Sequence, residues 1–278
     1  MRARLNYIFE SVAGLVLAFV LWELVVRLFS IPKFILPPPS AVFAEAYSKA
    51  GILFHHCVST LSGTALSLVL GALLGVLIGL VIGYSRTASR LFFPLLGGFH
   101  ALPMSAFIPI FTVWFGLGAM PKVVAGVLIA FFPIAVNVVT GLRTIEPELW
   151  EMMRALKATK AQVFLKVGLP RAVPYFFASL KVAAAGAFIG NVVGEMLASG
   201  EGLGYVLILA TNQLAMALAF AALTILLLLG IVMFLSFDAL EKRVAPWAFR
   251  NTESSTVVAT PQSLTSSSIP LPQTSAPE

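Results

Sequence analysis

Six long apolar segments follow one another along the chain, separated by short polar stretches. They cover approximately residues 8–29, 59–83, 91–115, 122–142, 174–197 and 214–237. A helix that crosses a bilayer needs about 20 mostly apolar residues. The pattern therefore predicts an all-α integral membrane protein with six transmembrane helices. The first segment continues to Phe29 without a small-residue cleavage site behind a short core, so we expect a retained span rather than a signal peptide.

The composition of the 278-residue chain supports a membrane environment, since it is 59% hydrophobic and 11% charged, with a mean hydropathy of +0.96. A soluble domain carries roughly 25% charged residues. The net charge of +6 is spread over short segments rather than one patch, which argues against a nucleic-acid partner.

A single cysteine allows no intramolecular disulfide. His55, His56 and Cys57 are consecutive and no second cluster completes a ligand set, so no metal site is expected.

The positions of Lys and Arg predict the orientation in the membrane. If the N-terminus is cytoplasmic, only four of the 18 basic residues fall in outer segments, namely Arg27, Lys33, Lys49 and Lys122. Because an excess of Lys and Arg marks the cytoplasmic side, both termini are expected there. Residues 1–250 then form the membrane domain. Residues 251–278 are rich in Ser, Thr and Pro, and we expect a disordered cytoplasmic tail.

Several residues close to the predicted spans carry local expectations. Glu23 and Arg27 stand one helical turn apart in the first span, so their side chains are able to pair. Ser40 follows a run of prolines and is a candidate N-terminal cap of a short interfacial helix. Pro103 and Pro109 lie within the third span and Pro133 within the fourth, and they are expected to bend or interrupt these spans.

Small residues recur at helical spacing in two of the spans. They are Gly71, Gly75, Gly79 and Gly83 in the second span and Gly186, Gly190 and Gly194 in the fifth. Spacing by four puts each set on one helix face, where another backbone can approach closely. Two interpretations stay open: packing within one subunit, or a subunit interface or moving pathway wall. Glu195 ends the fifth span, and it is either a substrate contact near the outer surface or a hydrogen-bonded structural residue.

A basic amphipathic segment, residues 143–173, separates the fourth and fifth spans. Pro147 suits the first position of a short helix. The apolar face of that helix carries Leu149, Met152, Met153 and Leu156. Such a face must be covered by the membrane surface, by the protein itself or by a groove of a partner.

A second short helix is expected after a break at 157–159. Thr159 and Gln162 form a capping-box pattern at its start. Leu169-Pro170 is expected to end this helix, and Pro174 is expected to open the fifth span.

The amphipathic segment resembles the EAA loop of permease subunits of bacterial ABC importers. The matching positions are Glu151, Met152, Met153, Lys157, Leu169 and Pro170. The stretch VVGEMLASGEGLGY (192–205), the PPPS after the first span and VAPW (244–247) are similar to permeases of the nitrate/sulfonate/taurine group. The resemblance covers most of residues 10–250. Two methionines replace the usual alanines and Lys157 replaces the usual glycine, so the bend there is expected to have a different shape.

The resemblance implies a type I ABC importer permease-like fold in the bacterial inner membrane, with a cytoplasmic coupling helix. The implied ATPase-coupling residues are Glu151, Met152, Met153, Arg154, Leu156, Lys157, Leu169 and Pro170. Possible pathway or packing residues are Glu195, Gly186, Gly190 and Gly194. The implied partners are ATP-binding ABC subunits, an extracytoplasmic substrate-binding protein, a second copy of the chain and membrane lipid. The implied substrate is a small anion such as a sulfonate, taurine or nitrate, with a pyrimidine or vitamin precursor as the alternative.

The chain contains no GxxxxGK[ST] motif and no Gly-Lys dipeptide. It therefore lacks the loop that cradles nucleotide phosphates, and we expect no cofactor on this chain and ATP hydrolysis by a partner subunit.

A single-chain secondary transporter is the first alternative, but the two halves show no convincing repeat and intramembrane acids are few. An intramembrane enzyme is the second, but His100 has no carboxylate at helical spacing. A purely structural membrane subunit is the third.

Overall fold

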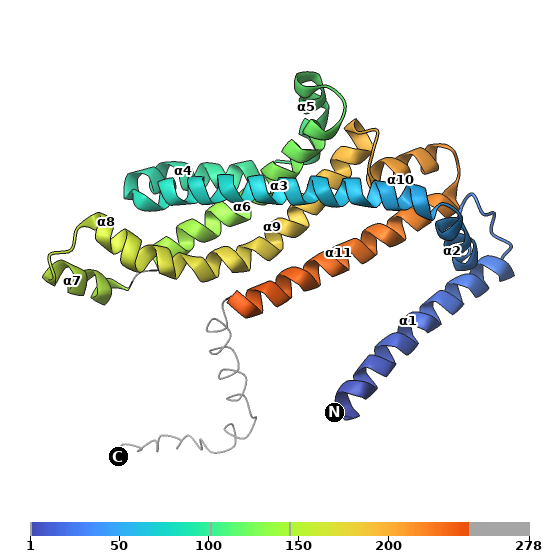
Figure 1. Ribbon diagram of the computed structural model, residues 1–278, viewed down its shortest axis with the longest axis horizontal. Helices are drawn as coiled ribbons and strands as arrows, with labels where there is room; N and C mark the ends of the chain where they lie inside the picture. Colours follow the sequence, from blue (N-terminus) through green and yellow to red (C-terminus); the bar gives the residue numbers. More distant parts are fainter. Residues whose placement is uncertain (1, 101, 145, 245–278) are drawn as a thin grey trace, which may run out of the picture.

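The computed structural model describes residues 2–100, 102–144 and 146–244, and every element in these ranges is helical. The helices are α1 (Arg2–Leu28), α2 (Pro39–Ser48), α3 (Ala50–Tyr84), α4 (Arg86–His100), the 3₁₀ turn η1 (Met104–Phe107), α5 (Ile108–Phe115), α6 (Ala119–Arg143), α7 (Pro147–Ala155), α8 (Lys160–Val163), the π-helical turn η2 (Phe164–Gly168), α9 (Leu169–Ala198), α10 (Leu203–Asn212) and α11 (Met216–Val244). Figure 1 shows α7 and α8 at one end of an elongated body, and α2 and α10 at the other. The expected tail, residues 251–278, lies outside the described residues.

Four helices within the described residues are long and apolar enough to cross a bilayer, against six predicted spans. They are Ala50–Tyr84, Ala119–Arg143, Lys160–Ala198 and Met216–Glu241. Helix α1 has 27 residues and covers the predicted first span. The prediction of a single third span at 91–115 is wrong, because α4, η1 and α5 divide it. The expected interruption by Pro103 and Pro109 is confirmed at this break, where proline removes backbone donors and restricts the preceding residue. Pro133 does not interrupt the fourth span, since it lies inside α6.

Helix α6 forms the centre of the fold, with α3 and α9 packed on two of its sides. On the α3 side, an added Cβ at Gly71 would lie 2.8 Å from the Cβ of Ala130, and one at Gly79 would lie 2.8 Å from the Cβ of Val138. Small residues therefore let the two backbones approach closely, which favours helix association in lipid. The buried side chains between these helices are Leu68, Ala130, Ile134, Val138, Leu142, Ala183, Ala184 and Ala187.

The glycines of α9 face the same central helix. An added Cβ would lie 2.8 Å from Ile129 Cγ2 at Gly186 and 2.9 Å from the Cα of Gly126 at Gly190, and at Gly194 it would lie 2.5 Å from the Cα of Lys122. These contacts all lie within one chain. They therefore support the first interpretation of this glycine series, packing within one subunit.

The C-terminal end of α1 is tied to α2 by a carboxylate. The expected Glu23–Arg27 pair is confirmed, with Arg27 Nε donating to Glu23 Oε1 at 2.7 Å. The prediction that Ser40 caps α2 is wrong, since the helix begins at Pro39 and no side-chain cap is present. Instead, the backbone N–H and the hydroxyl of Ser40 donate to Glu23 at 3.0 and 2.8 Å. Glu23 thus places a negative charge at the N-terminus of α2, where the helix dipole favours it.

We expect Gly75→Val to lower the free energy of unfolding of the detergent-solubilised protein by about 1–3 kcal/mol. The reason is steric, because the added Cβ would lie 2.6 Å from the backbone oxygen of Phe131 and 2.9 Å from Ile134 Cβ. Gly51→Val is the matched control in the same helix, since no atom lies within 4 Å of its added Cβ. Denaturant unfolding followed by circular dichroism measures the difference. Equal stability of the two variants would contradict the close α3–α6 packing.

Candidate functional site

The basic segment forms two short helices joined by a tight turn. Helix α7 starts with Pro147 at its first position, as predicted. At its other end, Lys157 N–H donates to the carbonyl of Arg154 and Ala158 N–H to that of Met153, both at 2.9 Å. This pair of bonds is a Schellman motif, whose central position usually carries glycine. Lys157 occupies it with a φ of 55°. The lysine therefore adopts the left-handed conformation that glycine would supply, and the bend keeps a standard form.

The second helix starts as predicted but does not end as predicted. Thr159 N–H donates to Gln162 Oε1 at 2.8 Å and Gln162 N–H to Thr159 Oγ1 at 3.3 Å, which confirms the capping box. However, Leu169-Pro170 does not end the helix, and Pro174 lies inside α9. The chain stays helical through α8, η2 and α9, over the 39 residues Lys160–Ala198. Pro170 has no N–H and cannot donate the regular helical hydrogen bond. The wider π turn Phe164–Gly168 accommodates the missing bond, so the helix continues into α9.

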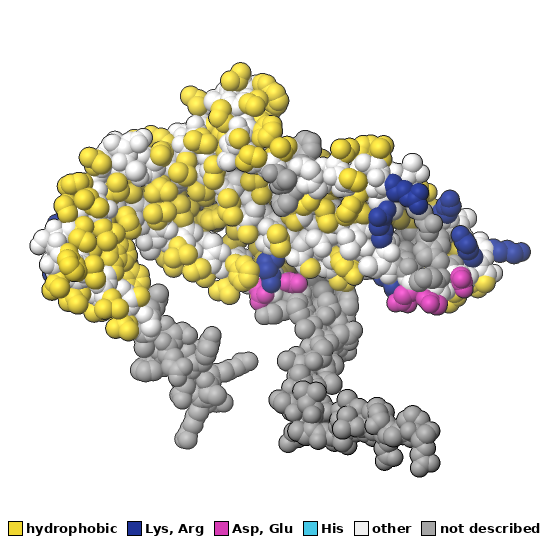
Figure 2. All heavy atoms as spheres, turned by 180° about the vertical axis from the view of Figure 1, so that it is seen from behind, with side chains coloured by type: hydrophobic (Ala, Val, Ile, Leu, Met, Phe, Trp, Pro, Cys, Tyr) yellow, Lys and Arg dark blue, Asp and Glu magenta, His cyan; other side chains and the backbone are white. Residues whose placement is uncertain are grey.

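The expected coupling residues are mostly exposed at this end of the molecule. Met152 and Leu156 have exposed fractions of 50% and 70%. The side chains of Glu151, Arg154, Lys157 and Pro170 are exposed, Leu169 is 38% exposed and Met153 is half-buried. Figure 2 shows Lys, Arg, Asp and Glu side chains gathered at the end that carries α7 and α8. We call the exposed residues Met152, Arg154, Leu156 and Lys157 the coupling surface.

The segment is anchored to the membrane helices on both sides. Arg171, in the first turn of α9, donates to the carbonyl of Thr144 at 3.1 Å and lies 3.5 Å from the carboxylate of Glu146. The ring of Phe164 in η2 meets that of Tyr84, at the end of α3, edge to face at 5.3 Å. The coupling surface is therefore connected to α3, α6 and α9.

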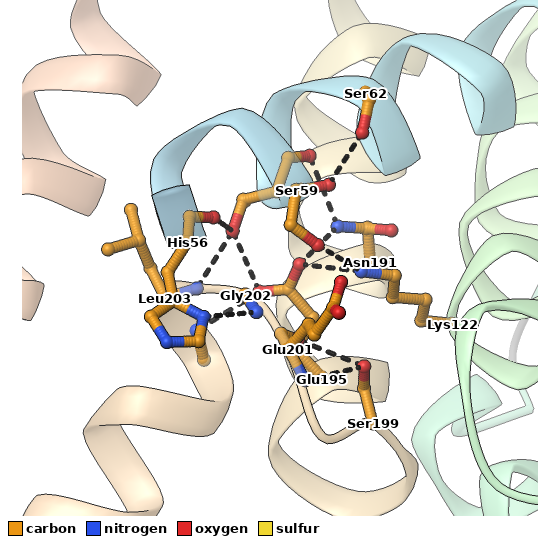
Figure 3. Close-up of polar contacts among 12 residues, drawn as sticks. His56, Ser59, Ser62, Lys122, Asn191, Glu195, Ser199, Glu201, Gly202 and Leu203 are labelled. Atoms are coloured by element: carbon orange, nitrogen blue, oxygen red, sulfur yellow. Dashed lines mark hydrogen bonds and ion pairs between the residues drawn. The ribbon is translucent and has the colours of Figure 1, made fainter. Parts of the chain in front are cut away.

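A second cluster of polar residues lies at the opposite end of α9, around Glu195 (Figure 3). Glu195 is 0% exposed. Its Oε1 accepts hydrogen bonds from Asn191 Nδ2 at 3.1 Å and from Lys122 Nζ at 3.3 Å. Its Oε2 accepts from Thr60 Oγ1 at 2.9 Å and from the backbone N–H of Gly204 at 3.0 Å. The buried carboxylate therefore forms an ion pair with Lys122, and its remaining hydrogen-bonding capacity is filled by the three other donors. These contacts join α3, α6, α9 and α10.

The same cluster caps the N-terminus of α10. Three consecutive backbone N–H groups donate hydrogen bonds to side chains of the cluster. The N–H of residue 202 donates to His56 Nδ1 at 3.0 Å, that of 203 to Thr60 Oγ1 at 2.9 Å and that of 204 to Glu195 Oε2 at 3.0 Å. These groups have no partner within the helix, and the helix dipole favours a carboxylate there. Gly202 has a φ of 106°, and an added Cβ at Gly202 or Gly204 would contact Glu195. The SGEGLGY stretch therefore carries glycine where the Glu195 carboxylate rests against the backbone.

Sequence reasoning singled out Glu195 but missed its partners Thr60, Lys122 and Asn191. Asn191 was detectable, since it precedes Glu195 by four residues and shares its helix face. Lys122 was counted among the outer basic residues, whereas the structure buries it in α6 with 4% exposure. Thr60 is 135 positions from Glu195, and no local pattern predicts that contact.

A cleft of about 640 Å³, lined by both polar and apolar residues, opens beside this cluster. It lies between α3, α6 and the loop that joins α9 to α10, and its polar side chains are Ser59, Ser62, Lys122, Ser199 and Glu201.

Residues 71–246 match the family described as binding-protein-dependent transport system inner membrane component. The chain is a member of this family of ABC importer permeases. The permease is 36% identical to a probable ABC transporter permease of Haemophilus influenzae, covering 80% of this chain and 91% of the relative. It is 34% identical to a formylaminopyrimidine transport permease of Halalkalibacterium halodurans, over 82% and 91% of the two chains. It is 27% identical to a taurine transport permease of Escherichia coli, over 85% and 89%.

These matches confirm the resemblance inferred from the sequence. The fold is similar to that of a methionine ABC transporter in inward-facing conformations, with a TM-score of 0.59 and 21% identity over 71% of this chain and 98% of the other. The permease is therefore an all-helical, multi-pass membrane subunit with the fold of type I ABC importers. Its family functions with ATP-binding subunits and a substrate-binding protein.

Replacing Glu195 by Leu should lower the free energy of unfolding by about 3–5 kcal/mol, because it leaves the Lys122 ammonium buried without its carboxylate. Adding Lys122→Met should recover part of the loss, since the unpaired charge disappears, while the cap of α10 stays broken. Glu45→Leu is the control, because its pair with Lys49 is accessible to solvent and surface pairs contribute about 0–1 kcal/mol. Unfolding in detergent measures all four proteins. A double variant no more stable than Glu195→Leu alone would contradict the buried pair.

The Schellman turn predicts opposite effects of two substitutions at Lys157. Lys157→Gly should keep or raise the protection of the Ala158 amide against hydrogen exchange, because glycine adopts positive φ freely. Lys157→Val should lower that protection by about tenfold, because a β-branched residue is strained in the left-handed region. Lys160→Val removes a lysine from an ordinary helical position and is the control. Greater protection in Lys157→Val than in Lys157→Gly would rule out this turn.

Proposed function

We propose that this permease forms the translocation pathway of an ATP-driven importer and couples to a separate ATPase through residues 147–170. The observation that carries the proposal is the coupling surface, where Met152 and Leu156 expose large apolar side chains beside Arg154 and Lys157 at a charged end of the protein. Apolar side chains in such surroundings mark an interaction site. An amphipathic helix that lays its apolar face into a groove is a common mode of docking between proteins.

The continuous helix from Lys160 to Ala198 supplies the mechanical connection. At 1.5 Å per residue its 39 residues measure about 58 Å. One end begins directly beyond the coupling surface, and the other carries Glu195. Closure of the ATPase pair would push on α7 and α8 and tilt α9, and the pathway would alternate between outward-open and inward-open states.

Helix α11 would move with α9 through a second ionic contact. Lys181 Nζ, on α9, donates to Asp238 Oδ1 at 2.6 Å and lies 3.1 Å from Glu241 Oε2, both on α11. Its ammonium also lies 5.2 Å from the ring centroid of Phe234. These contacts join the two helices between the coupling surface and the outer cluster.

The proposed assembly contains two copies of this chain, two ATP-binding subunits that hydrolyse ATP, and an extracytoplasmic binding protein. The α7–α8 end would face the cytoplasm, as would both termini, and the α10 end would face outward, following the distribution of Lys and Arg. Glu195, Gly186, Gly190 and Gly194 would position the pathway wall by packing α9 on α6. This chain itself would bind no nucleotide or other cofactor.

The proposed substrate is a small polar organic solute delivered by the binding protein. Taurine and sulfonates are supported by the names of relatives at 27–30% identity. A pyrimidine or vitamin precursor is supported by the formylaminopyrimidine permease at 34% and a riboflavin permease at 36%.

We expect Leu156→Asp and Arg154→Glu each to reduce co-purification of the ATPase subunit by at least about tenfold, because a groove that accepts this surface would meet a misplaced charge. Removal of residues 151–157 should abolish it. Lys33→Glu, a charge reversal in the outer loop, is the control and should leave it unchanged. Tagged permease, expressed with the ATPase and purified in detergent, provides the measurement.

Full ATP-driven uptake by the Leu156→Asp variant would refute the coupling assignment. A wild-type permease that retains no ATPase would refute the importer proposal and favour a single-chain secondary transporter.

A further inference from the structure

The outer cleft contains hydrogen-bonding groups that the protein itself does not use. Lys122 Nζ has three N–H groups, and two of them are directed to Ser59 Oγ at 3.0 Å and Glu195 Oε1 at 3.3 Å. The third has no acceptor in the part of the chain that the structure describes. A side chain that is 95% buried and retains a free donor at the wall of a cleft is positioned for a ligand.

The loop between α9 and α10 supplies acceptors to the same cleft. The side chain of Glu201 is exposed in the loop between α9 and α10, and within the described ranges its carboxylate accepts no hydrogen bond. Its backbone position is fixed, because Glu201 N–H donates to Ser199 Oγ at 3.2 Å and Ser199 Oγ donates back to the Glu201 carbonyl at 2.9 Å. Ser59 and Ser62 add hydroxyl groups from α3.

Glycine 63 widens the cleft next to a buried amide. Gly63 lines the cleft, and an added Cβ there would lie 3.1 Å from the amide carbon of Asn191. The Oδ1 atom of this buried amide has no hydrogen-bond partner among the described residues. This oxygen is the atom closest to the position of the added Cβ, so the glycine leaves room for the buried amide behind the wall of the cleft.

The charges of the cleft disfavour simple anions. The positive charge of Lys122 is balanced by Glu195, so Glu201 leaves one unbalanced negative charge at the wall. His56 adds no positive charge, because its Nδ1 accepts a hydrogen bond from Gly202 N–H and an imidazolium could not accept one. A sulfonate or nitrate without a cationic group would meet net repulsion here.

We infer that this cleft is a solute-binding subsite on the import route, selective for molecules that combine a hydrogen-bond acceptor with an amine. The acceptor group meets Lys122 and the amine meets Glu201. Aminopyrimidines and zwitterionic aminosulfonates share this chemistry, whereas alkanesulfonates lack the amine. The inference rests on the proposed importer function and adds to it a solute class and the residues that discriminate.

The test uses a cysteine in the cleft of the complete importer, with the ATPase subunits and the binding protein. Cys57→Ser removes the single native thiol, and Ser62→Cys places one at the cleft. Thiol modification is measured with a cationic and an anionic methanethiosulfonate of similar size. Ser48→Cys is the control, because it lies beside the balanced pair Glu45–Lys49. We expect the cationic-to-anionic rate ratio to be at least about threefold higher at Ser62→Cys than at Ser48→Cys, and to fall on Glu201→Gln.

Protection from modification identifies the solute class. Taurine should slow modification of Ser62→Cys more than ethanesulfonate, and 4-aminopyrimidine more than pyrimidine, because each pair differs only in the amine. Glu201→Gln should remove both differences. If Ser62→Cys does not assemble, Leu66→Cys reports on the same cleft.

Any of three results would overturn the inference. They are equal protection by ethanesulfonate and taurine, a faster reaction with the anionic reagent, and no protection by any of the four solutes. None of these results affects ATPase co-purification. A failed subsite is therefore distinguishable from a failed importer assignment.

Discussion

The half of this permease that carries α10 depends on one buried carboxylate. Glu195 joins Lys122 on α6, Thr60 on α3 and the first turn of α10, and each contact replaces water that the burial removes. Without the carboxylate, a buried ammonium and a helix N-terminus would both lose their partner. Gly202 and Gly204 of the SGEGLGY stretch follow from this requirement, because side chains there would occupy the space of the carboxylate. An acidic residue in a span therefore serves here to hold four helices in one arrangement.

The two ends of α9 are built on different principles. The end that carries Glu195 is fixed by a polar network in which both carboxylate oxygens are paired. The other end continues into a segment whose apolar side chains are left exposed, and which is attached by Arg171 and by the Phe164–Tyr84 ring contact. The polar network is formed within the chain, whereas the proposed ATPase partner would cover the exposed apolar side chains. This asymmetry fits a subunit that receives force at one end and positions a cleft at the other.

Local sequence patterns predicted the local structure well. The capping box at Thr159, the helix start at Pro147 and the Glu23–Arg27 pair depend on residues at most four positions apart, and all three are confirmed. Hydrophobicity predicted a single third span at 91–115, which fails because the chain divides into separate helices around Pro103. The Leu169-Pro170 pattern predicted a helix end, which fails because the π turn before it lets the helix continue into α9. The contacts of Glu195 with Thr60 and Lys122 cross 135 and 73 positions, and only the packing of α3 and α9 on α6 brings them together.

The length of the helix Lys160–Ala198 sets a limit on how the outer end can respond. Its length of about 58 Å is nearly twice the thickness of a bilayer core. A rotation of about 6° around its midpoint displaces each end by about 3 Å, as the length of a rigid rod requires. That displacement is as long as one hydrogen bond in the Glu195 network, whose donor–acceptor distances are 2.9–3.3 Å. The network must therefore move with α9 as a single block, together with α10 and the N-terminal end of α3, or its hydrogen bonds must break. In the proposed importer, a rotation driven at the coupling surface would in this way move the wall of the cleft at the other end of α9.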